Sequence, residues 1–570
     1  MKKYLSVLFL IMFLPGTVWA VSTYYDTSEA YTPPTSSGTV YYLDAVNGSD
    51  SNDGLAATTG GGHGPWQTLS KMSYRYYDPG AGAQFLLRTG KYYGGIDISS
   101  NWTKGTGAAP IIVAAYGDGE VIIDASIANT LGAWSVYSGS IYQSTLTTVP
   151  SPNSICAVVI DGDFRDYLSA TNLAGVTGPG LWFYDSTAHV LYVWAVGGVN
   201  PTGHDIVVIK TPADGSYDSA VSVDYGQNYV TFSNLTLRGS DADGIYIAPY
   251  GGVVSDHITF TRCKIEFNGK AGIWAQSTTN LELSKNYWYG NVLTNWPLGT
   301  WNSNCSDSLF GWAPTVSIVS NSNAWIHGNI VDRGCGEGII FLGDATSGSN
   351  LAEYNIVRDA FSTSMYLDHA VNCTFRDNMV ISHNYANSDI KQSCSGQIAG
   401  IERKARAVGI ISANEGGDGT NCGSGNSMYN NLILGATVGL GNGDETTSGC
   451  VLSNESWFSN TIIMPNFNPA SYGGGTYVGI SITSGSSSGV SIKNNLIIGQ
   501  DSNSLLVSWA ANSGVTWNDN LYYHTNNSTP FVLEGTNYGF SNWKTQTGQD
   551  ANSVNSAPLL NRTDWSTLVQ

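Results

Sequence analysis

Four similar short segments within residues 338–445 carry the side chains best suited to chemistry. Each has the pattern of a strand that ends in an acidic residue, and aligning their starts brings five titratable residues together. Asp344, Glu415 and Glu445 fall in one column, and Asp368 and His369 fall beside it. If the segments stack in space, this acidic column forms a site.

A column of carboxylates suits hydrolysis of a glycosidic bond, in which one carboxyl protonates the leaving oxygen and another activates water or attacks the sugar. Parallel strands lie roughly 4.8 Å apart, so Glu415 and Glu445 approach the spacing of a retaining pair, and Asp344 with Glu415 the wider spacing of an inverting pair. Asp368 and His369 would hold a proton, bind a hydroxyl or tune a neighbour. Two alternatives stay open: the acids end their strands in solvated turns, or they bind calcium.

A basic run supports a different chemistry. Arg403, Lys404 and Arg406 lie within four residues of one another in a chain that has only 24 Lys and Arg. Cleavage of a uronate polymer by β-elimination requires a base and a group that neutralises the substrate carboxylate. Lys404 would be the base and Arg403 or Arg406 the neutralising group. The alternative is a solvated loop, because a loop lysine needs burial to act as a base near neutral pH.

Two further groups of residues could bind ligands. Trp296, Trp301 and Trp312 belong to one segment and would form a sugar platform, or alternatively anchor that segment to the body. Asp50, Asn52 and Asp53 offer closely spaced oxygen ligands for calcium. The alternative is a tight Asx-rich turn, since no Glu follows at the spacing of a helix-loop-helix calcium site. We expect no organic cofactor.

An internal repeat predicts how these residues are positioned. Ten times, one position is followed by two or three apolar residues, at intervals of 29, 23, 43, 26, 23, 53, 29, 35 and 25 residues. Nine of the ten positions are Asn, which indicates stacked rungs with a side-chain amide ladder inside a bend. The positions are Asn234, Cys263, Asn286, Asn329, Asn355, Asn378, Asn431, Asn460, Asn495 and Asn520.

The repeat predicts an all-β chain whose main part is a parallel β-helix, a solenoid in which each rung packs on its neighbours. The four acidic segments are then consecutive rungs. The two widest intervals place long loops, about 290–313 and 383–407, at the same bend. These loops would form the walls of a groove whose floor carries the acidic column.

The remaining segments differ in composition. Two lysines, an apolar run and the sequence Val18-Trp19-Ala20 are typical of a bacterial-type signal peptide, so we expect export to the periplasm or the extracellular space. No later apolar run is long enough to span a membrane. The predicted parts are a signal peptide at 1–20, a flexible leader at 21–40, an N-terminal cap with the first turns at 41–129, an antiparallel β insertion at 130–215, the parallel β-helix at 216–535 and a C-terminal cap at 536–570.

The net charge of −19 argues against nucleic acid or an anionic membrane as a partner, and more weakly against an anionic polysaccharide. We expect a monomer. The eight cysteines permit disulfides in an exported chain. Pairs of Cys305 with Cys335 or of Cys394 with Cys422 would each fix a long loop, and buried free thiols are the alternative.

The opening of the chain resembles that of secreted right-handed parallel β-helix proteins, the pectate lyase-like fold. The matching stretches are YYLDAVNGSDSNDGL, PWQTLSK, FLLRTGKYYG and AAYGDGEVIIDAS. The resemblance implies the right-handed coil and a polysaccharide substrate, but lyases, glycosidases, epimerases and surface proteins share this architecture. Our leading hypothesis is that the protein is an enzyme that cleaves a polysaccharide by glycoside hydrolysis. The alternatives are a uronate lyase and a non-catalytic glycan-binding protein.

Overall fold

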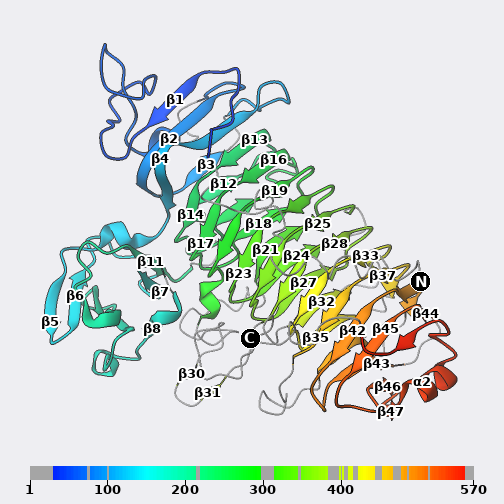
Figure 1. Ribbon diagram of the computed structural model, residues 1–570. Coiled ribbons are helices and arrows are strands. Elements are labelled where there is room, and N and C mark those ends of the chain that lie inside the picture. The colour runs from blue at the N-terminus through cyan, green and yellow to red at the C-terminus, as the bar shows by residue number, and fades with distance from the viewer. Residues whose placement is uncertain are drawn as a thin grey trace.

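Strands dominate the computed structural model of the protein (Figure 1). The structure describes residues 30–72, 78–98, 102–162, 164–212, 218–296, 313–343, 348–382, 397–398, 401–402, 408–414, 422–442, 452–465, 477–483, 487–510 and 514–558. Most of these residues coil through three faces of parallel strands, named faces 1, 2 and 3 in the order in which each rung visits them. The predicted parallel β-helix is therefore confirmed.

Face 1 begins with β1 (Val40–Leu43) and continues through the first halves of β2 (Gln84–Tyr93) and β4 (Ile111–Asp124), which bend and continue into face 2. Its later strands are β13 (Asn228–Ser233), β16 (Asp256–Thr261), β19 (Glu282–Ser284), β22 (Trp325–His327), β25 (Leu351–Glu353), β28 (Thr374–Arg376), β33 (Ser427–Tyr429), β37 (Ser456–Phe458), β41 (Val490–Lys493) and β44 (Val515–Asn518).

Face 2 follows one bend later in each rung. Its strands are β14 (Thr236–Arg238), β17 (Lys264–Glu266), β20 (Tyr287–Tyr289), β23 (Ile330–Asp332), β26 (Ile356–Arg358), β29 (Met379–Ile381), β34 (Leu432–Leu434), β38 (Thr461–Ile463), β42 (Leu496–Gly499), β45 (Leu521–His524) and β48 (Val554–Asn555).

Face 3 runs as a diagonal stack through the middle of Figure 1. Its strands are β3 (Ile96–Ile98), β12 (Val221–Val223), β15 (Ile245–Ile247), β18 (Ile273–Gln276), β21 (Pro314–Val319), β24 (Glu337–Leu342), β27 (Thr363–Asp368), β32 (Val408–Ala413), β35 (Val438–Asn442), β39 (Val478–Ile482), β43 (Leu505–Trp509) and β46 (Phe531–Leu533).

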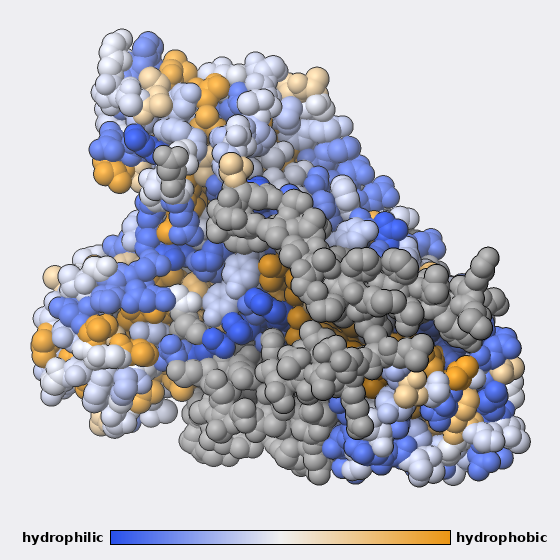
Figure 2. Space-filling view, in the orientation of Figure 1, coloured by the Kyte–Doolittle hydropathy of each residue, from blue (hydrophilic) through white to orange (hydrophobic). Residues whose placement is uncertain are grey.

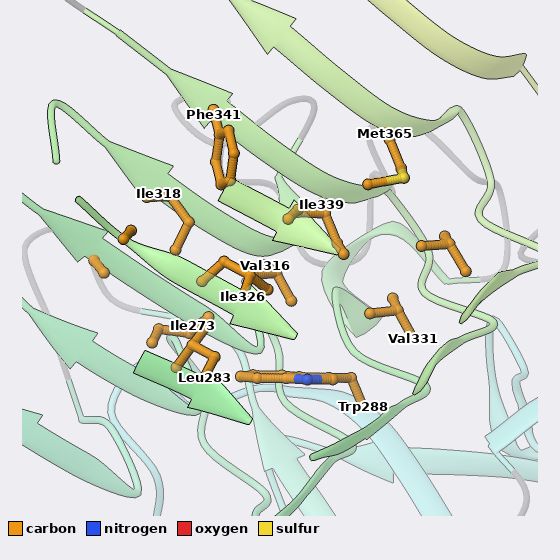
Figure 3. Packing of buried hydrophobic residues seen from close by; sticks show 14 of the residues in the cluster. Ile273, Leu283, Trp288, Val316, Ile318, Ile326, Val331, Ile339, Phe341 and Met365 are labelled. Carbon is orange, nitrogen blue, oxygen red and sulfur yellow. The ribbon is translucent and has the colours of Figure 1, made fainter. Parts of the chain in front are cut away.

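The core fills the inside of the coil. Alternate residues of each strand point inward, so the three faces of a rung contribute side chains such as Ile273, Leu283 and Trp288, all fully buried (Figure 3). The next rungs stack Val316, Ile339 and equivalent residues on these. This stacking buries apolar surface that no single rung could bury alone.

The predicted asparagine ladder lies at the bend between faces 1 and 2. The Oδ1 atom of each Asn accepts the backbone N–H of the ladder residue one rung earlier, as in Asn355 to Asn378 at 3.0 Å, and its Nδ2 also bonds along the stack. The same bond joins Asn378 to Asn431 although 53 residues separate them. One residue of the predicted set is wrong: the strand pairing puts Leu235, not Asn234, opposite Cys263.

The misplaced Asn234 has a conformational role. It has a φ of 56°, and the residues that precede the ladder asparagines, such as Lys285 and Asp377, share this left-handed backbone conformation. Asn adopts that region more readily than most residues. Asn suits both the ladder position and the position before it, so the sequence repeat was aligned on Asn234 instead of Leu235.

The predicted antiparallel insertion is confirmed. Its main sheet orders β5 (Ser135–Ser138), β6 (Ile141–Thr145), β10 (Val190–Trp194), β9 (Leu181–Asp185) and β8 (Leu168–Ser169), and β7 (Ile155–Ile160) pairs antiparallel with β11 (Ile206–Lys210). All of these pairs are antiparallel except the short β8–β9 pair. The insertion has its own apolar cluster, which includes Trp182 and Leu191.

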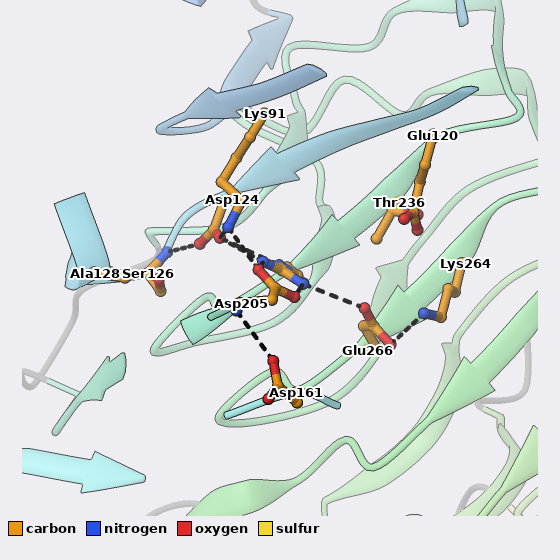
Figure 4. A network of polar contacts seen from close by, with 11 residues as sticks. Lys91, Glu120, Asp124, Ser126, Ala128, Asp161, Asp205, Thr236, Lys264 and Glu266 are labelled. Carbon is orange, nitrogen blue, oxygen red and sulfur yellow. Dashed lines mark hydrogen bonds and ion pairs between the residues drawn. The ribbon is translucent and has the colours of Figure 1, made fainter. Parts of the chain in front are cut away.

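Ion pairs attach the insertion to the outer surface of face 2 (Figure 4). Asp205, just before β11, accepts bonds of 2.7 and 2.6 Å from the Arg238 guanidinium and one of 2.7 Å from Lys91 Nζ. Arg238 also binds the fully buried Asp124 and lies 3.7 Å from Glu266, which Lys264 contacts at 2.8 Å. Buried charges that are paired in this way hold a fixed arrangement.

The C-terminal helix α2 (Phe540–Thr547) covers the last rung. Its fully buried Trp543 packs on Trp509, Trp517 and Phe531, and its indole N–H donates 2.8 Å to Asp550. Within the part of the chain that the structure describes, no helix is long and apolar enough to cross a membrane.

Candidate functional site

The outer surface of face 3 presents one side chain per rung in a row, because every second residue of a strand points away from the core. In the first seven rungs the inner neighbours of the row are buried apolar residues, mostly aliphatic, with Phe341 and Met365. We call these outward positions the outer row of face 3: Asp97, Ser222, Tyr246, Trp274, Ser317, Ile340, Tyr366 and Ile411.

Asp368 is the last residue of β27, and His369 follows it directly. The strand register places Asp368 between Leu342 of β24 and Ala413 of β32. Both residues are nearly covered, at 8% and 7% exposed, and His369 Nδ1 lies 2.7 Å from Asp368 Oδ1. A carboxylate in contact with an imidazole nitrogen orients the ring and stabilises its protonated form. The pair can therefore exchange or hold a proton.

The surroundings of this pair are apolar. Ile340, Tyr366 and Ala413 form a buried cluster on the outside of the coil, and Leu342 and Ile411 pack against it. Figure 2 shows apolar surface in the middle of this side of the molecule. Low-dielectric surroundings strengthen electrostatic interactions. A charge that develops on a bound substrate would interact strongly with Asp368 here.

The other members of the predicted site lie outside the described residues: Asp344, Glu415 and Glu445 of the acidic column, Arg403, Lys404 and Arg406 of the basic run, and Trp301 and Trp312. Described residues border two of the acidic segments. Asn414 Oδ1 accepts the N–H of Gly423, and Asn442 Oδ1 accepts the N–H of Thr483. These bonds fix the ends of the strands that precede Glu415 and Glu445 in the sequence.

The structure places Trp296 against the insertion. Its side chain is 5% exposed, its ring packs edge-on against Phe164 at 5.1 Å, and its indole N–H donates 2.9 Å to the carbonyl of Tyr167. This arrangement is the anchoring alternative of the sequence analysis. A ring that is buried in this way has no free face for a sugar.

The proposed calcium ligands each serve the loop in which they lie. Asp50 accepts the backbone N–H groups of Gln67 and Thr68, Asn52 donates to the carbonyl of Pro65, and Asp53 accepts from Leu55 and contacts His63. The three side chains bind different partners, as in an Asx-rich turn. Among the described residues, no three His, Cys, Asp or Glu side chains are grouped to hold a metal ion.

The cysteines are mixed. Cys156, Cys335 and Cys422 are each part of a disulfide, whereas Cys263 and Cys373 are buried free thiols. Burial raises the pKa of Cys263 to about 12, so this thiol is not a nucleophile near neutral pH. Cys305 and Cys394, the suggested partners of Cys335 and Cys422, lie outside the described residues.

A second set of acids lies at the edge of face 3. Asp241 and Asp243 lie in the bend between β14 and β15; burial raises their pKa values to about 6 and about 7, although Lys210 and Lys270 oppose this effect. Asp243 accepts the N–H of Ala271 at 3.0 Å, and Lys210 Nζ lies 3.5 Å from Asp241. Both acids therefore have structural partners at the edge of face 3.

Four residues at the start of the outer row were not predicted as site residues from the sequence. Asp97, Tyr246 and Trp274 are partly exposed there, and Asp224 follows β12. Burial and the nearby Asp97 raise the pKa of Asp224 to about 7. The alternation in the GIYI and GIWA segments would have revealed the two aromatic positions. The proximity of the two acids would not have been revealed, because residues 130–215 separate them in the sequence.

Comparison with known proteins shows the same architecture. Residues 219–402 match the protein family described as right handed beta helix region. A stretch of 107 residues, 19% of this chain, is 34% identical to a lacto-N-biosidase of Bifidobacterium longum subsp. longum, of which it covers 6%. The chain thus spans a small fraction of that relative's length.

Solved structures with low sequence identity are also similar. A complex of XylC with xylose has a TM-score of 0.47 at 11% identity, covering 87% of this chain and 86% of that one. A GH136 lacto-N-biosidase from Eubacterium ramulus has a TM-score of 0.42 at 12% identity, covering 91% and 67%. Pectate lyase Pel9A has a TM-score of 0.36 at 14% identity, covering 85% and 80%. By its own strand topology the chain is a parallel β-helix protein, and residues 219–402 match the right-handed β-helix family in sequence.

Proposed function

We propose that this protein is an enzyme that cleaves a polysaccharide or oligosaccharide bound across face 3, by glycoside hydrolysis. The observation that carries the proposal is the covered Asp368–His369 pair on an apolar outer surface of the coil. The local similarity to a lacto-N-biosidase, a name that denotes a glycosidase, supports it. So does the predicted export, which would bring the protein to extracellular glycans.

Hydrolysis requires two carboxyl groups with different roles. Asp368 supplies one of them, and His369 holds it in orientation and buffers its charge. We expect the second among Asp344, Glu415 and Glu445, the acidic residues of the adjoining segments. Glu415 follows Ala413, the register partner of Asp368, by two residues. One carboxyl would protonate the leaving oxygen while the other attacks the sugar carbon or activates water.

A product assay tests the proposal. Purified protein is incubated with neutral and uronic polysaccharides, and both new reducing ends and the ultraviolet absorbance of unsaturated uronates are followed. We expect reducing ends without that absorbance, and loss of both substrate cleavage and product in Asp368→Asn. Full activity of Asp368→Asn would refute the assignment. Binding without any product in wild type would indicate a glycan-binding protein instead.

β-Elimination from a uronate polymer is the second candidate. The contact between His369 and Asp368 favours it specifically, because an imidazole beside a carboxylate is a suitable base for a carbon-bound proton. The same assay separates the two reactions, since elimination leaves an unsaturated uronate at the new end and hydrolysis does not.

A further inference from the structure

We propose that Asp97, Asp224, Tyr246 and Trp274 form a binding subsite for neutral sugar units at the N-terminal end of face 3. The inference rests on the proposed function, since it assigns a substrate class to the same surface. The proposed subsite lies several rungs away from Asp368. A substitution can therefore remove the subsite or Asp368 without removing the other.

The register brings the aromatic residues and Asp97 into one row. Ser222 pairs with Asp97 on one side and with Tyr246 on the other, and Tyr246 pairs with Trp274. Their inner neighbours, such as Ile245 and Ile273, are fully buried, whereas the row itself is partly exposed. Adjacent parallel strands are roughly 4.8 Å apart, so Tyr246 and Trp274 place two aromatic side chains at neighbouring positions of the row.

Asp224 adds a hydrogen-bond acceptor beside this surface. Its Oδ1 atom is buried and has no hydrogen-bond partner among the residues that the structure describes. The Asp97 carboxyl lies near enough to help burial raise the pKa of Asp224. A buried acceptor without a donor costs free energy until a ligand supplies the donor. Sugar hydroxyls are such donors.

Trp274 has the features expected of a stacking residue. In the described part of the chain its indole forms neither a hydrogen bond nor a ring contact, unlike the buried Trp543 of the core, which forms both. Aromatic faces bind the apolar face of a sugar ring while neighbouring acceptors bind its hydroxyls. Two carboxyls and two aromatic rings therefore match a neutral or amino sugar and repel a uronate.

The position of the subsite implies a long substrate. Trp274 lies on β18 and Asp368 on β27, three rungs later, which corresponds to roughly 14 Å at the usual strand spacing. Tyr246 and Asp224 lie one and two rungs beyond Trp274. A glycan that reaches both places must extend along the coil. The subsite would then hold units remote from the bond that is cleaved.

Affinity gel electrophoresis tests this subsite. Wild type and variants run in gels that contain xylan, mixed-linkage β-glucan or galactomannan as neutral glycans, and pectate or alginate as uronate glycans. We expect retardation in a neutral gel only, and about fivefold weaker binding for Trp274→Ala, as stacking of about 1 kcal/mol predicts. Tyr246→Ala and Asp224→Asn should weaken it as well, and Trp274→Phe should restore most of it.

Trp325 provides a matched control. It is 42% exposed on face 1, and Trp325→Ala should bind glycans as wild type does. Unchanged binding in Trp274→Ala, no retardation of wild type in any gel, or Trp274-dependent retardation in pectate or alginate would each overturn the inference. Asp368→Asn should still be retarded while it loses turnover. If it keeps turnover, the proposed function fails while the subsite stands.

Discussion

On the outer surface of face 2, Asp124, Glu266 and Asp332 each lie beside a cation, whereas on face 3 Asp224 and Asp368 lie among aromatic and apolar residues. Asp332, for example, binds the Arg358 guanidinium at 2.5 Å. Asp224 instead lies near the Asp97 carboxyl, and Asp368 contacts the imidazole of His369. Paired charges on face 2 fix the insertion to the coil. In the proposed function, the carboxyls on face 3 are those that a ligand uses.

The largest effect expected from this contrast is on turnover. Asp368→Asn should lower the rate of reducing-end formation by about 10²–10⁴-fold, the usual contribution of a positioned acid or base, with little change in the unfolding midpoint. The matched control on face 2 is Asp332→Asn, which removes a carboxylate bound by Arg358 and Tyr287. It should lower stability and keep turnover. Loss of turnover in both variants would show that the carboxylates of faces 2 and 3 do not have different roles.

The next effect is on folding stability. Arg238→Met leaves the buried Asp124 and Glu266 without their shared cation, so the free energy of unfolding should fall by about 3–5 kcal/mol. Urea unfolding followed by tryptophan fluorescence measures the change. Lys285→Met, outside this network, is the control and should be near neutral. A stabilised Arg238→Met variant would show that the ion pairs are not what holds the insertion.

A smaller effect concerns acid. Burial would raise the pKa of Asp205, but the hydrogen bonds from Arg238 and Lys91 outweigh it and hold that pKa well below its usual range. Its contribution to stability is therefore complete above the unfolded-state pKa of about 4 and is lost as the pH falls below it. Asp205→Asn should flatten the decline of stability between about pH 5 and pH 2. An unchanged acid limb would contradict the pairing.

The smallest effect has the opposite sign and lies on face 3. Burial and Asp97 raise the pKa of Asp224 to about 7, so its stabilising protonated state is complete below about pH 4 and is lost as the pH rises through 7. Asp224→Asn should therefore be more stable than wild type at pH 8 and equal to it at pH 4. Thermal unfolding at both pH values measures this. Equal stability of Asp224→Asn and wild type at pH 8 would show that the Asp224 carboxyl is solvated.

The coil was predictable because its repeat is local: an Asn, two apolar residues and a turn recur in most rungs. The misassignment of Asn234 arose because adjacent positions of the bend both accept Asn. The buried place of Trp296 depends on Phe164 and Tyr167, which lie far away in the sequence. Asp97 and Asp224 escaped notice for the same reason. Alignment of similar sequence segments identifies residues that recur in each repeat. It does not identify a site whose residues come from dissimilar segments.

The hydrogen-bond geometry of the asparagine ladder does not depend on the length of the loops between its residues. Successive ladder residues lie 23 to 53 positions apart, yet the backbone N to Oδ1 distance stays between 3.0 and 3.1 Å from Asn286 to Asn520. A rung therefore closes in the same way whatever is inserted between its strands. The length of the sequence inserted between the strands of a rung can therefore change while the coil keeps its geometry.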